Sequence, residues 1–223
     1  TGDPSEPVRE VTPNEFALDG SYSLKLSEKF SMAVAGRFIN SNLKVATEDV
    51  DASAASSFAV DVAGFYQSEE IAYADFNGRW RAGFNIQNLG PKISYDNDDI
   101  SSNFLPANLR LGGGFDFILD DYNKVSVSAE FTKLLVPTPP GPGTPVDANG
   151  DGDFTDPEDI TQAEANSTNY NNYNDIGWVE GIFKSFGDAP DGFSEELKEV
   201  TYSLAGEYMY QDSFAVRAGY FHE

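Results

Sequence analysis

The sequence has no cysteine and a single histidine, His222, close to its end. Without cysteine there is no disulfide framework, thiolate metal site or cysteine nucleophile. With one imidazole, a Ser-His-Asp triad or a histidine-rich metal site has little support, so we expect no enzyme. Basic residues are also scarce: 14 stand against 37 acidic ones, and the formal net charge is -23. That charge argues against a nucleic-acid partner, because polyanions repel one another.

Long hydrophobic runs are missing as well. No segment approaches the roughly 18 to 20 apolar residues that a transmembrane helix requires. A transmembrane β-strand needs only about 9 to 11 residues in which every second one is apolar. The composition therefore leaves insertion into a membrane open by way of strands.

Alternating side-chain type is what the chain does contain, and residues 109–140 show it most clearly. Each arm of this stretch places apolar residues on one face and polar residues on the other, as expected for a strand. A polar turn at residues 120–123 joins the arms, and prolines from Pro137 onward prevent further ladder pairing. The stretch is predicted to be a β-hairpin.

Eight segments carry this alternation, at about residues 15–26, 30–40, 58–67, 76–89, 109–119, 125–135, 200–210 and from 214 onward. Short turns and longer loops alternate between them, which predicts an all-β, antiparallel up-and-down meander. A soluble β-sandwich shows the same alternation. We favour an outer-membrane β-barrel because aromatic residues recur near strand ends, and because charges of both signs recur on the polar faces.

The two faces of such a barrel have different neighbours. We expect five hydrophobic residues of the hairpin to meet lipid: Leu111, Phe115, Phe117, Val127 and Phe131. Charged side chains are expected in the lumen, where opposite signs neutralise one another: Asp61, Arg79, Arg81, Arg110, Asp116, Glu130 and Arg217. The turn at 120–123 would lie in the periplasm, and residues 1–13 are predicted to be a loop that enters the first strand.

The loop at about residues 136–195 has twelve acidic residues and one lysine, a formal charge of -11. Inside it, DANGDGDFTDPE matches the calcium-loop pattern D-x-[DN]-x-[DN]-G-x5-E. Alternate short oxygen side chains would point to one centre, a glycine would make the sharp turn, and the last glutamate would close the shell. The candidate calcium ligands are Asp147, Asn149, Asp151, Asp153 and Glu158.

The alternative for this acidic segment is a solvated tip without an ion. Pro157 immediately precedes the closing glutamate, and no flanking helix is evident on either side. Both interpretations stay open. No other cofactor is expected.

Apolar residues return after the acidic segment, and Trp178, Ile182, Phe183 and Phe186 have helical spacing. Residues 193–198 predict a further helical turn. These side chains could tuck the loop over the barrel mouth, or they could form a surface for a partner. The candidate partner-binding residues are Trp178, Phe183, Phe186 and Phe193.

Specific strings narrow the interpretation further. They are NEFALDGSYSLKL (14–26), FLPANLRLGGGFDF (104–117), DDYNKVSVSAEFTKLLVPTPP (120–140) and the last 42 residues, which begin IFKSFGDAPDGF. These segments resemble PorV (LptO), the outer-membrane barrel family of the type IX secretion system of Bacteroidota. The resemblance implies a FadL-like barrel of fourteen strands. Residues 1–223 would then form part of a single barrel domain.

The resemblance also implies a function and partners. Proteins of this family accept secreted cargo through its C-terminal signal domain as it leaves the SprA translocon, and pass it to the cell-surface attachment complex that contains the PorU sortase. A FadL-like transporter of hydrophobic small molecules is the alternative that uses the same architecture, and a soluble calcium-binding β-sandwich is a third. We expect the chain in the bacterial outer membrane, with its long loops at the cell surface.

Overall fold

The structure is a computed structural model that describes residues 13–43, 54–95, 102–190 and 192–223. Most of the loop predicted at residues 1–13 lies outside these ranges. The long connections that we expect between the second and third segments, at residues 41–57, and between the fourth and fifth, at residues 90–103, are described only in part.

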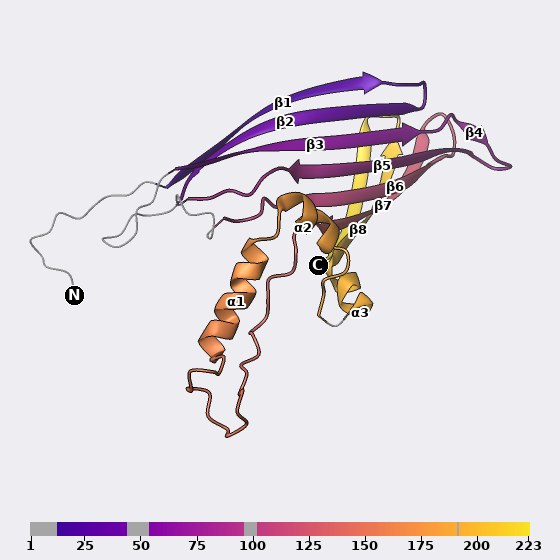
Figure 1. Cartoon of the computed structure of the whole chain (residues 1–223). Helices are drawn as coiled ribbons and strands as arrows, with labels where there is room; N and C mark the ends of the chain where they lie inside the picture. Colours follow the sequence, from indigo (N-terminus) through magenta and orange to yellow (C-terminus); the bar gives the residue numbers. More distant parts are fainter. Residues whose placement is uncertain (1–12, 44–53, 96–101, 191) are drawn as a thin grey trace, which may run out of the picture.

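One antiparallel sheet dominates the chain (Figure 1). Its strands are β1 (Asn14–Lys25), β2 (Phe30–Asn42), β3 (Ala55–Gln67), β4 (Ile71–Ala72), β5 (Asn77–Leu89), β6 (Asn108–Ile118), β7 (Asn123–Leu134), β8 (Val200–Tyr210) and β9 (Phe214–His222). Apart from β4, which pairs with β5, the strands follow one another across the sheet in chain order. The predicted all-β up-and-down meander is confirmed. In the described residues β1 and β9 are the two ends of this order.

The prediction of eight strands missed β4, which lies in a segment that we expected to be a connection. Ile71 pairs with Gly78 and Ala72 with Asn77. Two residues are too few to show an alternation, so the pairing depends on β5 rather than on a local pattern. The eight long strands lie within a few residues of the predicted segments.

The two ends of the sheet differ, as Figure 1 shows. Residues 26–29, 119–122 and 211–213 are tight turns at one end, where the β3–β5 connection also lies. At the other end the connections are long, and the longest runs from β7 to β8. That connection contains α1 (Gln162–Asn174), α2 (Trp178–Lys184), α3 (Phe193–Glu196) and the short helix η2 (Leu197–Glu199). None of the helices in the described ranges is long and apolar enough to span a bilayer.

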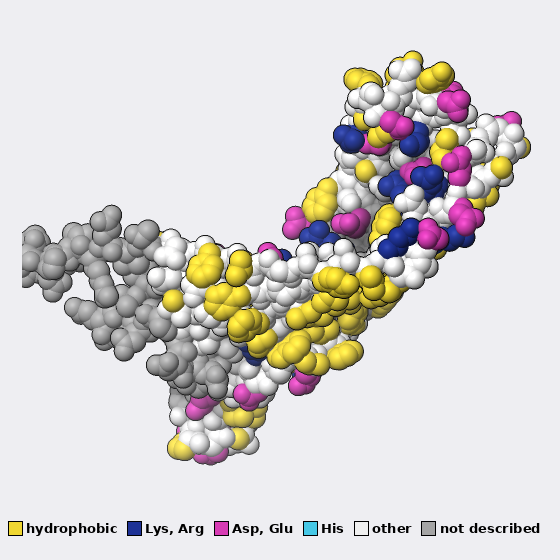
Figure 2. Space-filling view, turned by 90° about the horizontal axis from the view of Figure 1, so that it is seen from above, with side chains coloured by type: hydrophobic (Ala, Val, Ile, Leu, Met, Phe, Trp, Pro, Cys, Tyr) yellow, Lys and Arg dark blue, Asp and Glu magenta, His cyan; other side chains and the backbone are white. Residues whose placement is uncertain are grey.

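Hydrophobic side chains of neighbouring strands lie side by side on one face of the sheet, which we call the apolar face. Two rows consist of Trp80, Phe115 and Val127, and of Phe84, Leu111 and Phe131, with the small residues Ala82, Gly113 and Ala129 between them. Leu18 is 70% exposed and Trp80 is 53% exposed on this face. In Figure 2 these residue types form a band along the sheet. Such a large exposed apolar surface suits the hydrocarbon of a bilayer.

Aromatic rings gather near both ends of the apolar face. At the long-loop end, the Phe38 ring centroid lies 6.0 Å from that of Phe16 and 5.2 Å from that of Phe58. At the short-turn end, Trp80 lies 4.6 Å from Phe115. Aromatic side chains near both ends of the strands are typical of a barrel that crosses two membrane interfaces.

The opposite face carries ionisable side chains and is called the charged face. In the register, Arg79 lies opposite Asp116 and Gly112 lies opposite Glu130. The residues predicted to share the lumen side lie together here: Asp61, Arg79, Arg81, Arg110, Asp116, Glu130 and Arg217. The predicted division of the strands into two faces is therefore confirmed.

Candidate functional site

Charges on the charged face form pairs across strands. Arg37 on β2 donates to Asp19 on β1 at 2.6 Å and lies 3.3 Å from Asp61 on β3. Asp61 also accepts a 2.8 Å hydrogen bond from the backbone N–H of Asn88, a residue with φ of 58° beside a register shift in the β3–β5 ladder. Arg81 on β5 lies 2.7 Å from Asp116 on β6. In these pairs each charge lies next to one of opposite sign, so the face can carry many charged side chains.

The long β7–β8 connection is anchored to the sheet at Lys133, near the end of β7. Lys133 Nζ lies 3.0 Å from Glu196 Oε2 and 2.7 Å from Glu199 Oε2. The side chains of Lys133 and Glu196 are only 11% and 9% exposed. Glu196 also accepts a 2.9 Å hydrogen bond from the Ala189 N–H, and this bond together with Lys133 lowers the pKa of Glu196. The anchor holds α3 and η2 against the rim of the sheet.

A second set of contacts fastens α1 to residues 137–143, which we call the proline segment. Four α1 side chains, three or four residues apart, bond its backbone. Gln162 donates to Gly143 O at 2.6 Å, Asn166 accepts from Gly143 N at 2.8 Å, Asn169 donates to Gly141 O at 3.3 Å, and Tyr173 donates to Pro137 O at 3.2 Å. This spacing places all four on one side of the helix.

Sequence reasoning missed α1, and these bonds show why. The helix is held by polar side chains instead of an apolar stripe, so hydrophobic periodicity gives no signal. Its start did carry a signal, because Thr161 and Glu164 form a capping box in which each side chain bonds the backbone of the other. The expectation that no helix flanks the acidic segment is wrong on its C-terminal side. The helices predicted around 178–186 and 193–198 are present as α2, α3 and η2.

The acidic segment forms a tip, residues 147–159, closed at its base by a bridge between Val146 and Ile160. Asp147 accepts hydrogen bonds from Gly150 N at 2.5 Å and from Gly152 N at 2.8 Å, and the bond from Gly152 above all lowers the pKa of Asp147. Both glycines have positive φ, 76° and 86°. The turn that the sequence pattern assigns to Gly152 is therefore present.

The carboxylate at the end of the pattern does not close the tip. Glu158 is exposed, whereas the next residue, Asp159, is 9% exposed and accepts from Ala148 N at 2.9 Å and Asp156 N at 3.1 Å. Sequence reasoning missed Asp159 because it lies one position beyond the pattern. Its role is structural, since it satisfies two backbone donors.

The candidate calcium ligands bond their own loop. Asn149 donates to Asp151 at 3.2 Å, and Asp153 accepts from the Thr155 hydroxyl at 2.9 Å. Across the described residues, no three or more acidic or histidine side chains are grouped to hold a metal ion. The arrangement does not fit a preformed calcium shell, and calcium binding here stays a prediction.

The candidate partner-binding aromatics are solvent-exposed. Phe183 is 74% exposed, Phe193 77%, Phe186 52% and Trp178 36%. Phe183 and Phe186 border a groove of about 840 Å³ between the proline segment, the C-terminal half of α1 and the end of α2. Phe186 also lies near the end of β7, with Lys133 Nζ 6.0 Å from its ring centroid. The structure therefore brings two of the four residues to one groove and leaves all four exposed.

The fold and its two faces define a class. A single antiparallel meander that exposes an aromatic and aliphatic surface on one face and interleaved charges on the other fits an outer-membrane β-barrel. A comparison with protein-family models identifies one family within that class. The family model described as type IX secretion system protein PorV matches residues 2–141.

This match covers more than half of the chain, so the chain belongs to the PorV family and has a role in type IX secretion. PorV is a family of secretion-system components. The match ends within the proline segment, before the acidic tip. A comparison with curated proteins finds no match.

Proposed function

We propose that this protein is a non-catalytic cargo carrier of the outer membrane. It binds secreted proteins through their C-terminal signal domain at the SprA translocon and delivers them to the attachment complex that contains the PorU sortase. Family membership supports the secretion role. The observation that carries the proposed binding step is the groove bordered by Phe183 and Phe186, which lies at the long-loop end of the sheet.

Exposed aromatic side chains are suited to this role. Aromatic residues dominate the binding energy of many protein interfaces, because they bury a large area and lose little side-chain entropy. The groove is also held rigidly, since Tyr173 and Asn169 fasten α1 to the proline segment. A preformed groove lowers the ordering cost of binding.

The charge of the same loop favours a cargo surface of opposite charge. Residues 136–195 carry a formal charge of -11, and a strongly acidic surface speeds association with a basic partner surface. We therefore infer that the contacting surface of the cargo is basic around an apolar centre. In the proposed orientation the short turns face the periplasm and the long loops reach the cell surface.

Transport of hydrophobic small molecules is the second candidate, because a FadL-like barrel serves it too. It would require a continuous apolar path along the lumen. The charged face argues against such a path, since Arg37, Arg81 and Asp116 project from it in ion pairs.

Gene deletion tests the proposal. In a deletion strain, signal-bearing cargo should fail to reach the cell surface, and normal display would exclude the carrier role. The strain is then complemented with the wild-type gene or with a triple variant, Phe183→Ala, Phe186→Ala and Phe193→Ala. We expect the triple variant to restore barrel assembly but not cargo display. Phe154→Ala is the matched control, because Phe154 is a 40% exposed aromatic in the same loop outside the groove.

A further inference from the structure

The connection that follows β5 leaves the sheet towards the charged face. Alternation along β5 assigns Asn88 to the apolar face, together with Phe84. After the register shift between β3 and β5, however, the Asn88 side chain accepts a hydrogen bond from Arg37, which belongs to the charged face. Asn88 has a φ of 58°, and a bulge of this kind re-aims the chain. At Gly90 a Cβ would overlap the Phe58 carbonyl oxygen, so the chain passes directly against the backbone of β3.

The described parts of this connection, residues 90–95 and 102–107, are called the inner strap. Four buried apolar residues form a core between the strap and β3: Ala55, Ala59, Ile93 and Leu105. Ala59 is 2% exposed and lies opposite Arg37 in the ladder, so this core belongs to the charged face. The strap therefore covers one corner of the face that otherwise carries charges.

Polar side chains fix the strap along the same strands. Ser41 of β2 is 1% exposed; its hydroxyl donates to Glu15 at 2.6 Å and lies 2.7 Å from the Tyr95 hydroxyl of the strap. Ser57 of β3 is 4% exposed and donates to the Pro91 carbonyl oxygen at 3.0 Å. Buried hydroxyl groups of the charged face thus find their partners in the strap.

The helices of the β7–β8 connection back the strap from its other side. The Phe104 ring centroid lies 5.6 Å from that of Tyr173, near the end of α1. Lys92 donates to the Asn174 carbonyl oxygen at 2.7 Å, and its Nζ lies 4.2 Å from the Phe104 ring centroid. In α2, a Cβ at Gly181 would lie 2.8 Å from the Phe104 ring. The strap is therefore held between the sheet and the ends of two helices.

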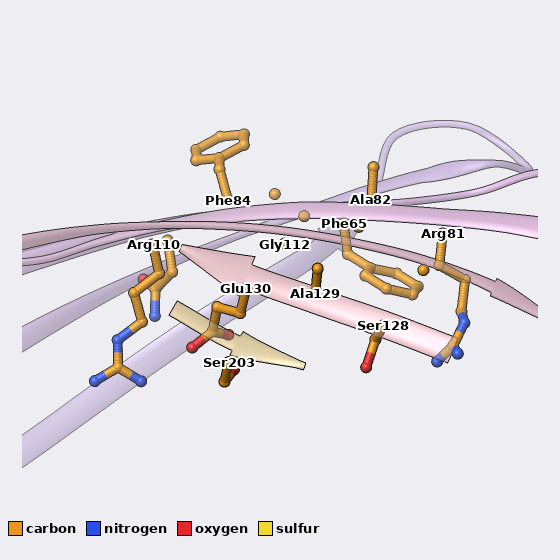
Figure 3. A pocket seen from close by; sticks show the side chains of 15 residues that line it. Phe65, Arg81, Ala82, Phe84, Arg110, Gly112, Ser128, Ala129, Glu130 and Ser203 are labelled. Atoms are coloured by element: carbon orange, nitrogen blue, oxygen red, sulfur yellow. The ribbon is translucent and has the colours of Figure 1, made fainter. Parts of the chain in front are cut away.

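Away from the strap the charged face is not filled by its own side chains. Arg81, Arg110 and Glu130 project from it beside a hollow of about 460 Å³, while Phe84 points to the other side (Figure 3). Side chains alone fill a barrel of about eight strands, whereas wider barrels enclose a channel unless a loop or helix plugs it. A wide barrel with this inner wall needs an additional element to close it.

We propose that the inner strap, with the ends of α1 and α2 stacked on it, plugs the lumen at the long-loop end and makes the barrel non-conducting. The bulge at Asn88 directs the strap inward, the core with β3 holds it against the wall, and Phe104 joins it to the helices. This proposal rests on the outer-membrane barrel of the proposed function, but not on cargo binding.

The test is the conductance of the full-length protein in planar lipid bilayers. We expect no steady current through the wild-type protein. A double variant, Ile93→Asp with Leu105→Asp, places carboxylates in the apolar core, where they are costly to bury without a partner; it should release the strap and give discrete open-channel steps. Val146→Asp with Ile160→Asp is the matched control, because these two apolar residues are 45% and 42% exposed at the base of the acidic tip. The control should stay closed.

Phe104→Ala is a second variant, which leaves the core with β3 intact and removes only the contact with the helices. It should give brief openings, and it decides the test if the double variant does not fold, as judged by heat-modifiable migration on gels. The plug is refuted if the wild-type protein conducts steadily, if the folded strap variants stay closed, or if the control opens as they do. Cargo display is scored separately: normal display in the deletion strain would refute the carrier role and leave the plug standing.

Discussion

Replacing Lys133 by methionine should release the β7–β8 connection from the sheet while the sheet itself stays folded. Methionine keeps most of the side-chain volume but removes the charge that lies 3.0 Å from Glu196 and 2.7 Å from Glu199. Removing one partner of a buried ion pair costs about 3 to 5 kcal/mol, because the remaining charge stays buried without compensation. Most of that cost falls on Glu196, which is 9% exposed, since Glu199 at 32% can be solvated.

Native-state hydrogen exchange measures this cost locally. A loss of about 3 kcal/mol should speed exchange in α3 and η2 on the order of a hundredfold, while the amides of β5 and β6 keep their rates. Lys124→Met is the control, because Lys124 pairs at 3.3 Å with an 81% exposed Asp212; such surface pairs contribute about 0 to 1 kcal/mol. A double variant, Lys133→Met with Glu196→Met, should recover much of the protection. If Lys133→Met leaves the exchange of residues 193–199 unchanged, the anchor does not hold the loop.

Three further outcomes are expected. Because Glu196 has a lowered pKa when the loop is docked, its contribution is complete above the ordinary glutamate pKa and is lost as the pH falls toward the lower, docked value. The protection of the α3 amides, measured relative to their intrinsic exchange rate at each pH, should therefore fall only in acid, and a fall in protection on raising the pH would contradict the assignment. Gly64→Val should lower the thermal stability by about 1 to 3 kcal/mol, because a Cβ would lie 2.3 Å from the Phe84 ring; unchanged melting in detergent would show that the ring moves aside freely. If the tip binds calcium, Asp151→Ala should abolish calorimetric calcium binding, whereas an unchanged affinity would refute the site.

Local pattern was enough to predict the strands and their faces. The side-chain period of a strand is two, so Arg110 and Leu111 must point to opposite faces wherever β6 lies. The local pattern could not predict which charged residues pair across neighbouring strands. The Arg37 pairs join residues 18 and 24 positions away in the chain, and only the register brings them together.

The loop was harder to predict for a different physical reason. Helix α1 depends on bonds between its side chains and a proline segment about twenty to thirty-six residues earlier, such as Gln162 to Gly143 and Tyr173 to Pro137. Motif matching placed the closing carboxylate at Glu158, whereas the fold uses Asp159 to satisfy two backbone donors. A short stretch of sequence shows neither which carboxylate is buried nor which distant residues a helix bonds.

Site-specific photo-crosslinking in living cells tests the carrier function most directly. A photoreactive residue at Phe183 should crosslink to secreted proteins through their C-terminal signal domain, and the same residue at Phe154 should not. Cargo that lacks the signal domain should give no crosslink at either position. Absence of cargo from the Phe183 crosslinks, or equal crosslinking at Phe154, would contradict the proposal that this groove receives cargo.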